Sequence, residues 1–254
     1  AGGGITLSSD GTDLLLDGTA IGGGGAALEL YVENPVSAVT PIATGVNSIS
    51  IGSNSQAAST NGNSIAIGTT ARATGNSSAA FGGNYPNASA AGSLALGYTP
   101  TASGAFSSAI GYNATAVGDS SVAFSKSYAS GADSFAAAIA NNTSTYGAQA
   151  LSAVAIGALT KATGSYSVAL GYQSRATGPY AQASGIYSLA SGAGSFAHGH
   201  IVSLASATAS GTGAVAFGSG SFADKQGKYA FASDSYWSNN SSGTAQYGLM
   251  VLRR

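Results

Sequence analysis

The sequence predicts an all-β fold, a parallel β-solenoid, and three observations support this prediction. An apolar phrase centred on alanine recurs about every 14 residues over most of the chain. Glycine, serine, threonine and valine dominate the repeat, which disfavours helix and suits strands and turns. Glycine recurs twice in each period, as Gly171 and Gly178 do, and is expected at left-handed or tightly packed corners. Each period is therefore expected to form one coil of two short strands joined by glycine turns.

The repeat is best followed through the alanine at the centre of each phrase. Most steps between these alanines are 14 residues, with one step of 15 and two longer steps of 18 and 19. The longer steps place inserts near residues 141–144 and after His200. Twelve coils at a strand spacing of about 4.8 Å predict a rod roughly 55–60 Å long. The aligned alanines are Ala66, Ala80, Ala95, Ala109, Ala123, Ala137, Ala155, Ala169, Ala183, Ala197, Ala216 and Ala230.

Strand alternation separates the residues of each apolar phrase onto two sides. In Val168–Leu170 the two larger residues point one way and Ala169 points the other. We expect the larger pair to fill the coil and the small alanine to face a second layer. A single coil has no such layer, so other copies of the chain are expected to supply it, in a homotrimer. The alanines expected at that interface are Ala66, Ala109, Ala123 and Ala169.

Composition narrows the function classes further. The formal net charge is −1 and only 7% of residues are charged, which argues against a nucleic-acid partner. The chain has no cysteine, so no disulfide or thiolate nucleophile is expected. No run approaches the ~20 apolar residues of a membrane-spanning helix, so no membrane insertion is expected. No signal peptide is expected within the chain either.

Both ends of the sequence depart from the period. Residues 1–45 are expected to form a β cap or attachment segment, with a hairpin, a glycine linker and a further strand in ALELYVENPV. This segment holds Asp10, Asp13, Asp17, Glu29 and Glu33; the first three are a weak alternative calcium site. Residues 46–232 are the predicted β-roll. Residues 233–254, with the aromatic residues Tyr236, Trp237 and Tyr247, are expected to cap the last coil or begin a following domain, and a sugar-binding cluster is the alternative.

No catalytic, metal or cofactor site is expected. Asp119 and Asp133 are 14 residues apart, hence in neighbouring coils, and are expected to be solvated rather than a glycosidase pair. His198 and His200 have no carboxylate within twenty residues for a serine-histidine triad. An ion site at His198, built from several chains, is an alternative to an ordinary hydrogen-bonded histidine.

An outward stripe of tyrosine, small hydroxyl and cationic side chains is the candidate receptor-facing surface. Tyr98 and Tyr112 are expected to stack on adjacent coils, and Tyr172 occupies the same position further along. Arg72, Lys161 and Arg175 share one register, directly before the alanine of the second strand. This stripe would suit a polysaccharide or a surface protein; an ordinary solvent-facing wall is the alternative.

Four phrases carry a family resemblance: NSIAIGTTARATG, GSLALGYTPTASG, FSSAIGYNATAVG and YSVALGYQSRATG. They resemble the YadA-like head repeat of trimeric adhesins. The resemblance covers about residues 46–232 and implies a left-handed parallel β-roll, three chains side by side, and a non-enzymatic fibre segment. Similar rolls occur in phage tail fibres, spikes and capsid appendages.

The expected function is therefore a structural or adhesion component of a phage appendage that presents a β-roll for host-cell attachment. The ending GKYAFASDSYWSNNSSGTAQYGLMVLRR resembles the segment that follows such repeats in phage structural proteins, where it leads into a further domain. Expected partners are two further copies of the chain, other virion proteins and a cell-surface glycan or protein. The alternative is the head of a bacterial trimeric autotransporter on the outer-membrane surface. An ice-binding solenoid and a glycan depolymerase are weaker alternatives, because Ser103, Val117 and Ser130 interrupt the threonine row and carboxylates are scarce.

Overall fold

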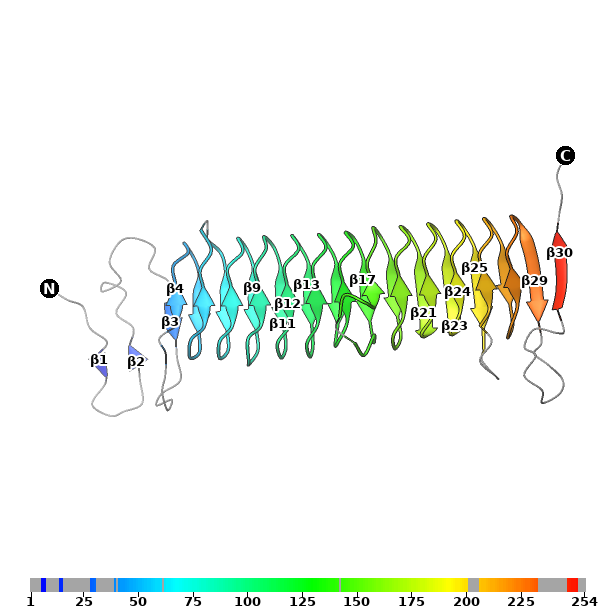
Figure 1. The fold of residues 1–254 in the computed structure, drawn as a ribbon. Coiled ribbons are helices and arrows are strands. Elements are labelled where there is room, and N and C mark those ends of the chain that lie inside the picture. The colour runs from blue at the N-terminus through cyan, green and yellow to red at the C-terminus, as the bar shows by residue number, and fades with distance from the viewer. Residues whose placement is uncertain are drawn as a thin grey trace.

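The chain forms a rod of stacked two-strand coils, as the computed structural model shows (Figure 1). The structure describes residues 6–7, 14–15, 28–30, 39, 41–60, 62–141, 143–200, 206–232 and 246–250. Within these residues there is no helix, and hence no helical segment long and apolar enough to cross a membrane. The all-β prediction is confirmed.

Alternate strands along the chain build two sheets, one on each side of the rod. In the described residues, sheet 1 has fifteen strands and sheet 2 has thirteen. Each coil contributes one strand to each sheet, and successive coils pair in parallel. The predicted two-strand parallel solenoid is therefore confirmed.

The strands of sheet 1 follow one another as β3 (Leu28–Leu30), β5 (Ile49–Ile51), β7 (Ile65–Ile67), β9 (Ala79–Phe81), β11 (Leu94–Leu96), β13 (Ser108–Ile110), β15 (Val122–Phe124), β17 (Phe135–Ala137), β19 (Val154–Ile156), β21 (Val168–Tyr172), β23 (Gln182–Ile186), β25 (Phe196–Gly199), β27 (Val215–Phe217), β29 (Lys228–Ala232) and β30 (Gln246–Met250). Sheet 2 runs through β4 (Ile42–Ala43), β6 (Gln56–Ala57), β8 (Arg72–Ala73), β10 (Asn87–Ala88), β12 (Thr101–Ala102), β14 (Thr115–Ala116), β16 (Tyr128–Ala129), β18 (Gly147–Ala148), β20 (Lys161–Ala162), β22 (Arg175–Ala176), β24 (Leu189–Ala190), β26 (Thr208–Ala209) and β28 (Phe222–Ala223).

The 14-residue period sets the register of the stack, because each residue pairs with its equivalent in the next coil. Ala169 lies between Ala155 and Ala183 in sheet 1. One predicted equivalence is wrong: Ala123 pairs with Ala136, and Ala136 with Ala155, so Ala137 is not the central alanine of its strand. The phrase offers three consecutive alanines, and a coil one residue shorter shifts the pairing by one position.

The interior of the rod contains almost entirely small side chains. In one coil Ser167, Ala169, Ser174 and Ala176 are fully buried. Apart from Ile139, Thr160 and three prolines, serine is the largest residue type that is fully buried in the described residues. The two sheets therefore lie too close together for valine or leucine to fit between them.

This finding corrects the predicted sides of the sheet 1 strands. Val168 is partly exposed, Leu170 is 38% exposed, and Ala169 is fully buried. The large residues thus face outward and the alanines fill the coil. The prediction that Ala66, Ala109, Ala123 and Ala169 face neighbouring chains is wrong, because each is enclosed within its own coil and has no accessible surface.

The two glycines that were expected at corners behave as predicted, each for a different reason. Gly171 adopts a φ of 110°, in the region that favours glycine. Gly178 is absent from that region, but a Cβ there would collide with the carbonyl oxygen of Gly192 in the next coil. Close stacking of backbones therefore requires glycine at both turns.

The ends of the rod carry strands outside the repeat. β1 (Thr6–Leu7) and β2 (Leu14–Leu15) pair antiparallel as the predicted hairpin, and β3 adds in parallel to β5. β30 pairs antiparallel with β29 at the other end. Asp10, Asp13, Asp17, Glu33, Tyr236 and Trp237 lie outside the described residues, while Glu29 lies in β3 and Tyr247 in β30.

Candidate functional site

The outer side of sheet 1 is a continuous apolar surface, called here the apolar face. It consists of the residues that flank the buried alanine in each strand from β5 to β29. Because the interior accepts only small side chains, the alternation of each strand directs every larger residue of the phrase outward. Its large members are Ile49, Ile51, Ile65, Ile67, Phe81, Leu94, Leu96, Ile110, Val122, Phe124, Phe135, Val154, Ile156, Val168, Leu170, Phe196, Val215, Phe217 and Phe231.

The apolar face is large for a surface left in water. Leu96, Leu170 and Phe217 are 42%, 38% and 45% exposed in the single chain. Thirteen strands that each present about 10 Å of outward chain cover on the order of 600 Å² in projection. That is the upper end of the largest apolar patches on soluble monomers, and surfaces of this kind mark interaction sites.

A polar group interrupts this face near its middle. Gln182 and Ser184 replace the apolar pair of β23, and His198 follows in β25. The Ser184 Oγ lies 2.8 Å from His198 Nδ1, and the His198 ring lies 4.8 Å from that of Phe217. The described residues hold no group of three His, Cys, Asp or Glu side chains that could bind a metal. His198 is therefore a hydrogen-bonded histidine on the apolar face, and His200 lies beyond the end of β25.

The carboxylates of the two neighbouring coils have structural surroundings. Asp119 and Asp133 do lie in adjacent coils, because the Asp133 backbone N–H donates to the Asp119 carbonyl oxygen at 2.8 Å. The Asp119 side chain accepts a hydrogen bond from the Ala105 backbone N–H at 2.9 Å. Asp119 thus stabilises the turn of the preceding coil.

Tyrosines line one edge of the rod, at the turns from sheet 1 to sheet 2. Tyr98 and Tyr112 stack with ring centroids 5.5 Å apart, as predicted, and Lys126 Nζ lies 5.3 Å from the Tyr112 centroid. Tyr172 is separated from this stack and meets Tyr187 edge-on, also at 5.5 Å. Because stacked rings cover each other's faces, little ring face remains free for a sugar.

A second pair of tyrosines, which the sequence analysis missed, lies on the opposite edge. Tyr166 and Tyr180 stack at 5.2 Å and are nearly parallel, and they are 48% and 63% exposed. Their separation of 14 residues, the coil period, was the available signal.

The three cations of the shared register do not form one group. Lys161 and Arg175 are direct partners on β20 and β22. Arg72 has the same position on β8, but six coils separate it from Lys161, roughly 29 Å along the rod. Asn87, Thr101, Thr115, Tyr128 and Gly147 fill that register between them.

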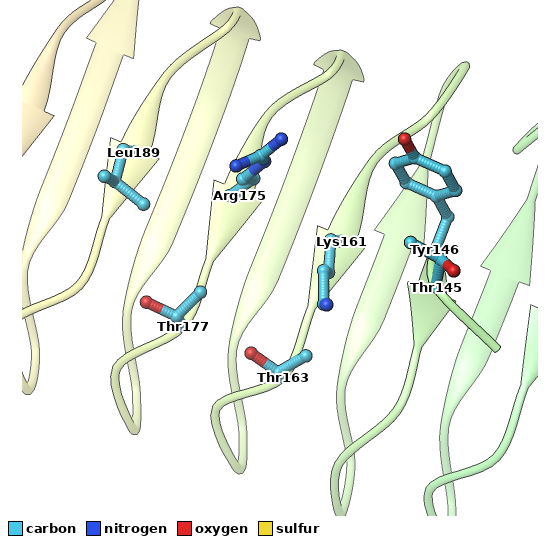
Figure 2. Close-up of a pocket in the computed structure, with 7 residues that line it drawn as sticks. All are labelled: Thr145, Tyr146, Lys161, Thr163, Arg175, Thr177 and Leu189. Atoms are coloured by element: carbon cyan, nitrogen blue, oxygen red, sulfur yellow. The ribbon is translucent and has the colours of Figure 1, made fainter.

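Lys161 and Arg175 border a hollow of about 340 Å³ on the outer side of sheet 2 (Figure 2). Thr163 and Thr177 lie beside the cations, one on each coil, and Leu189 lies beyond Arg175. On the side of Lys161 the wall is formed by Thr145 and Tyr146, from the insert that breaks the repeat. We call this group of seven residues the cationic hollow.

The family of YadA head domain repeats matches residues 43–62, 59–84, 102–124, 148–174, 176–195 and 205–223. The chain belongs to this family. No curated protein is detectably similar to the chain in sequence.

The YadA head is a structural adhesin domain, and heads of this kind are exposed at surfaces and form homotrimers. In this YadA-like head, the matched segments contain most of the apolar face and most of the cationic hollow. Thr145 and Tyr146 fall between two matched segments, because the insert that carries them is no part of the repeat. The apolar face thus belongs to the shared architecture, whereas the wall of the hollow is a feature of this chain.

Proposed function

We propose that the chain is a non-enzymatic adhesion module, a homotrimer that assembles through its apolar face and presents its polar faces to a target. The observation that carries this proposal is the apolar face itself. Each coil has a filled interior without help from another chain, so the outward isoleucine, leucine and phenylalanine side chains stabilise nothing within their own coil. Burying them against sister chains removes this surface from water and gains about 25 cal/mol per Å².

A closed threefold assembly follows from the shape of the chain and from its family. A rod with one apolar side can bury that side against identical rods around an axis parallel to its length, which is a closed cyclic arrangement. Heads of the YadA family form such trimers. Sheet 2, with its threonine, serine, lysine and arginine side chains, then remains on the outside of the trimer.

The particle that carries the module is the finer part of the proposal. We favour a phage fibre, spike or capsid appendage, with other virion proteins as partners and a cell-surface glycan or protein as receptor. The resemblance of the C-terminal segment to phage structural proteins supports this choice. The family match equally supports the head of a bacterial trimeric autotransporter on the outer membrane.

Immunogold labelling decides between these two carriers. Antibodies against the purified chain are applied to phage particles and to bacterial cells from the same source. Labelled tails or capsids support the appendage, and labelled cell envelopes from phage-free cells support the autotransporter. Adhesion is tested with the fluorescent chain on host cells; absence of saturable binding to any cell from the source would contradict the adhesion proposal.

A further inference from the structure

We propose that the cationic hollow is a binding site for an acidic polysaccharide, with Lys161 and Arg175 as the residues that bind its carboxylate or sulfate groups. This inference rests on the proposed adhesion function and names the chemical class of the target. It starts from an imbalance of charge. In the described residues both ion pairs involve Asp224, which pairs with Lys225 and Lys228, and the Lys228 hydrogen bond lowers the pKa of Asp224.

Lys161 and Arg175 have no such carboxylate partner among the described residues. They are directly opposite each other on adjacent parallel strands, about 4.8 Å apart in the backbone. Like charges at directly opposite positions destabilise a sheet. An anion between the two side chains removes this repulsion, and arginine adds a planar pair of donors that matches carboxylate and sulfate oxygens.

The surroundings of the two cations favour a sugar over a simple ion. Thr163 and Thr177 place one hydroxyl on each coil beside the cations, and each hydroxyl can donate and accept hydrogen bonds. Tyr146 adds an aromatic ring at one end of the hollow and Leu189 an aliphatic side chain at the other. Charge, hydroxyls and an aromatic wall together suit a ring with acidic and hydroxyl substituents.

The wall formed by the insert is held in place before any ligand binds. The side-chain amide of Gln149 donates to the carbonyl oxygens of Ser144 and Tyr146. The Tyr146 backbone N–H donates to the Thr143 carbonyl oxygen at 3.3 Å, and the Tyr146 side chain packs partly against the buried alanines. A fixed wall lowers the entropy lost on binding.

The size and openness of the hollow point to a segment of a chain. Its volume of about 340 Å³ is near the lower end of ligand pockets, about 300–1,000 Å³. Arg175 and Thr145 are exposed, so a longer molecule can enter and leave across the surface. The formal net charge of the whole protein is −1, which gives a polyanion no general attraction to it. Three such sites on a trimer would add avidity.

The test measures binding of the full chain to four fluorescent polymers by anisotropy. The probes are polygalacturonate, dextran sulfate, neutral dextran and single-stranded DNA. The site predicts saturable binding to polygalacturonate or dextran sulfate, whichever carries the preferred acid, and none to dextran. The double variant Lys161→Gln with Arg175→Gln is expected to weaken that binding at least tenfold while its melting temperature stays the same or rises.

Arg72→Gln is the matched control, because Arg72 has the same register and the same outer face but no insert beside it. It should bind like the unaltered chain. Equal loss in Arg72→Gln and in the double variant, equal binding to dextran, or stronger binding to DNA would overturn the site. Cell binding is measured in parallel: if unaltered chain and double variant bind cells equally, the site fails and adhesion stands. If the chain binds an acidic polymer through these residues but no cell, the site stands and the adhesion proposal fails.

Discussion

At the scale of single residues, the rod depends on interior serines whose hydroxyls find backbone partners. Ser78 donates to the Gly75 carbonyl oxygen at 2.6 Å and Ser93 to that of Ala90 at 2.7 Å. The Oγ of Ser195 is the exception, since it is buried and has no hydrogen-bond partner within the described residues. Alanine occupies the equivalent position in both neighbouring coils, as Ala181 and Ala214.

Two serine variants should therefore shift stability in opposite directions. Ser195→Ala removes an unsatisfied buried hydroxyl, so we expect unfolding in urea at an equal or higher concentration, with a gain of up to about 1 kcal/mol. Ser188→Ala should cost about 1–3 kcal/mol. Its hydroxyl donates to the Ser184 carbonyl oxygen at 2.6 Å and accepts from the Gly199 N–H at 2.9 Å. A larger loss from Ser195→Ala than from Ser188→Ala would contradict the described hydrogen bonding.

At the scale of the coil, the narrow interior sets which side chains each strand can turn inward. Ala169→Leu adds three carbons where there is no accessible space, and overpacking of this kind costs about 1–3 kcal/mol. Val168→Leu, on the same strand but facing outward, is the control and should change stability by less than about 0.5 kcal/mol. Urea unfolding at one protein concentration measures both. Equal effects would mean that the strand faces the other way.

The corners of the coil make an independent prediction. Gly178→Ala should destabilise by about 3 kcal/mol or more, the upper end of overpacking costs, because the added methyl meets the Gly192 carbonyl oxygen. Gly83→Ala is the control, since a Cβ at Gly83 meets nothing within 4 Å and its φ lies outside the left-handed region. Thermal melts followed by circular dichroism distinguish them. A tolerated alanine at 178 would contradict the close stacking of the coils.

Much of this element-level structure was predictable from the sequence, and the part that was not has a physical cause. The period predicts the pairing of Ala155 with Ala169 and of Lys161 with Arg175, because stacked coils bring equivalent positions together. Alternation shows that Ala169 and Leu170 face opposite sides, but both are apolar, so it does not show which side is inside. The distance between the two sheets decides that question, and it arises only when the coil closes. The cationic hollow was predicted only in its two cations, since Tyr146 lies in an insert that breaks the period.

At the scale of the whole molecule, the apolar face should control assembly and not the fold of the coil. Leu170→Lys places a charge in the middle of that face, where an interface would leave it buried without a partner. We expect this variant to dissociate at protein concentrations at which the unaltered chain stays assembled. Thr177→Lys, on the outer side of sheet 2, is the control and should assemble normally. Size-exclusion chromatography over a dilution series measures both, and identical profiles would argue against the apolar face as the interface.

The central claim is that sister chains cover the apolar face in a threefold assembly. Sedimentation equilibrium of the purified chain tests it most directly, because the measured mass does not depend on particle shape. The account predicts a species of three times the chain mass of 24.4 kDa, with a melting temperature that rises with protein concentration. A folded, β-rich species of 24.4 kDa that persists at high concentration would contradict it.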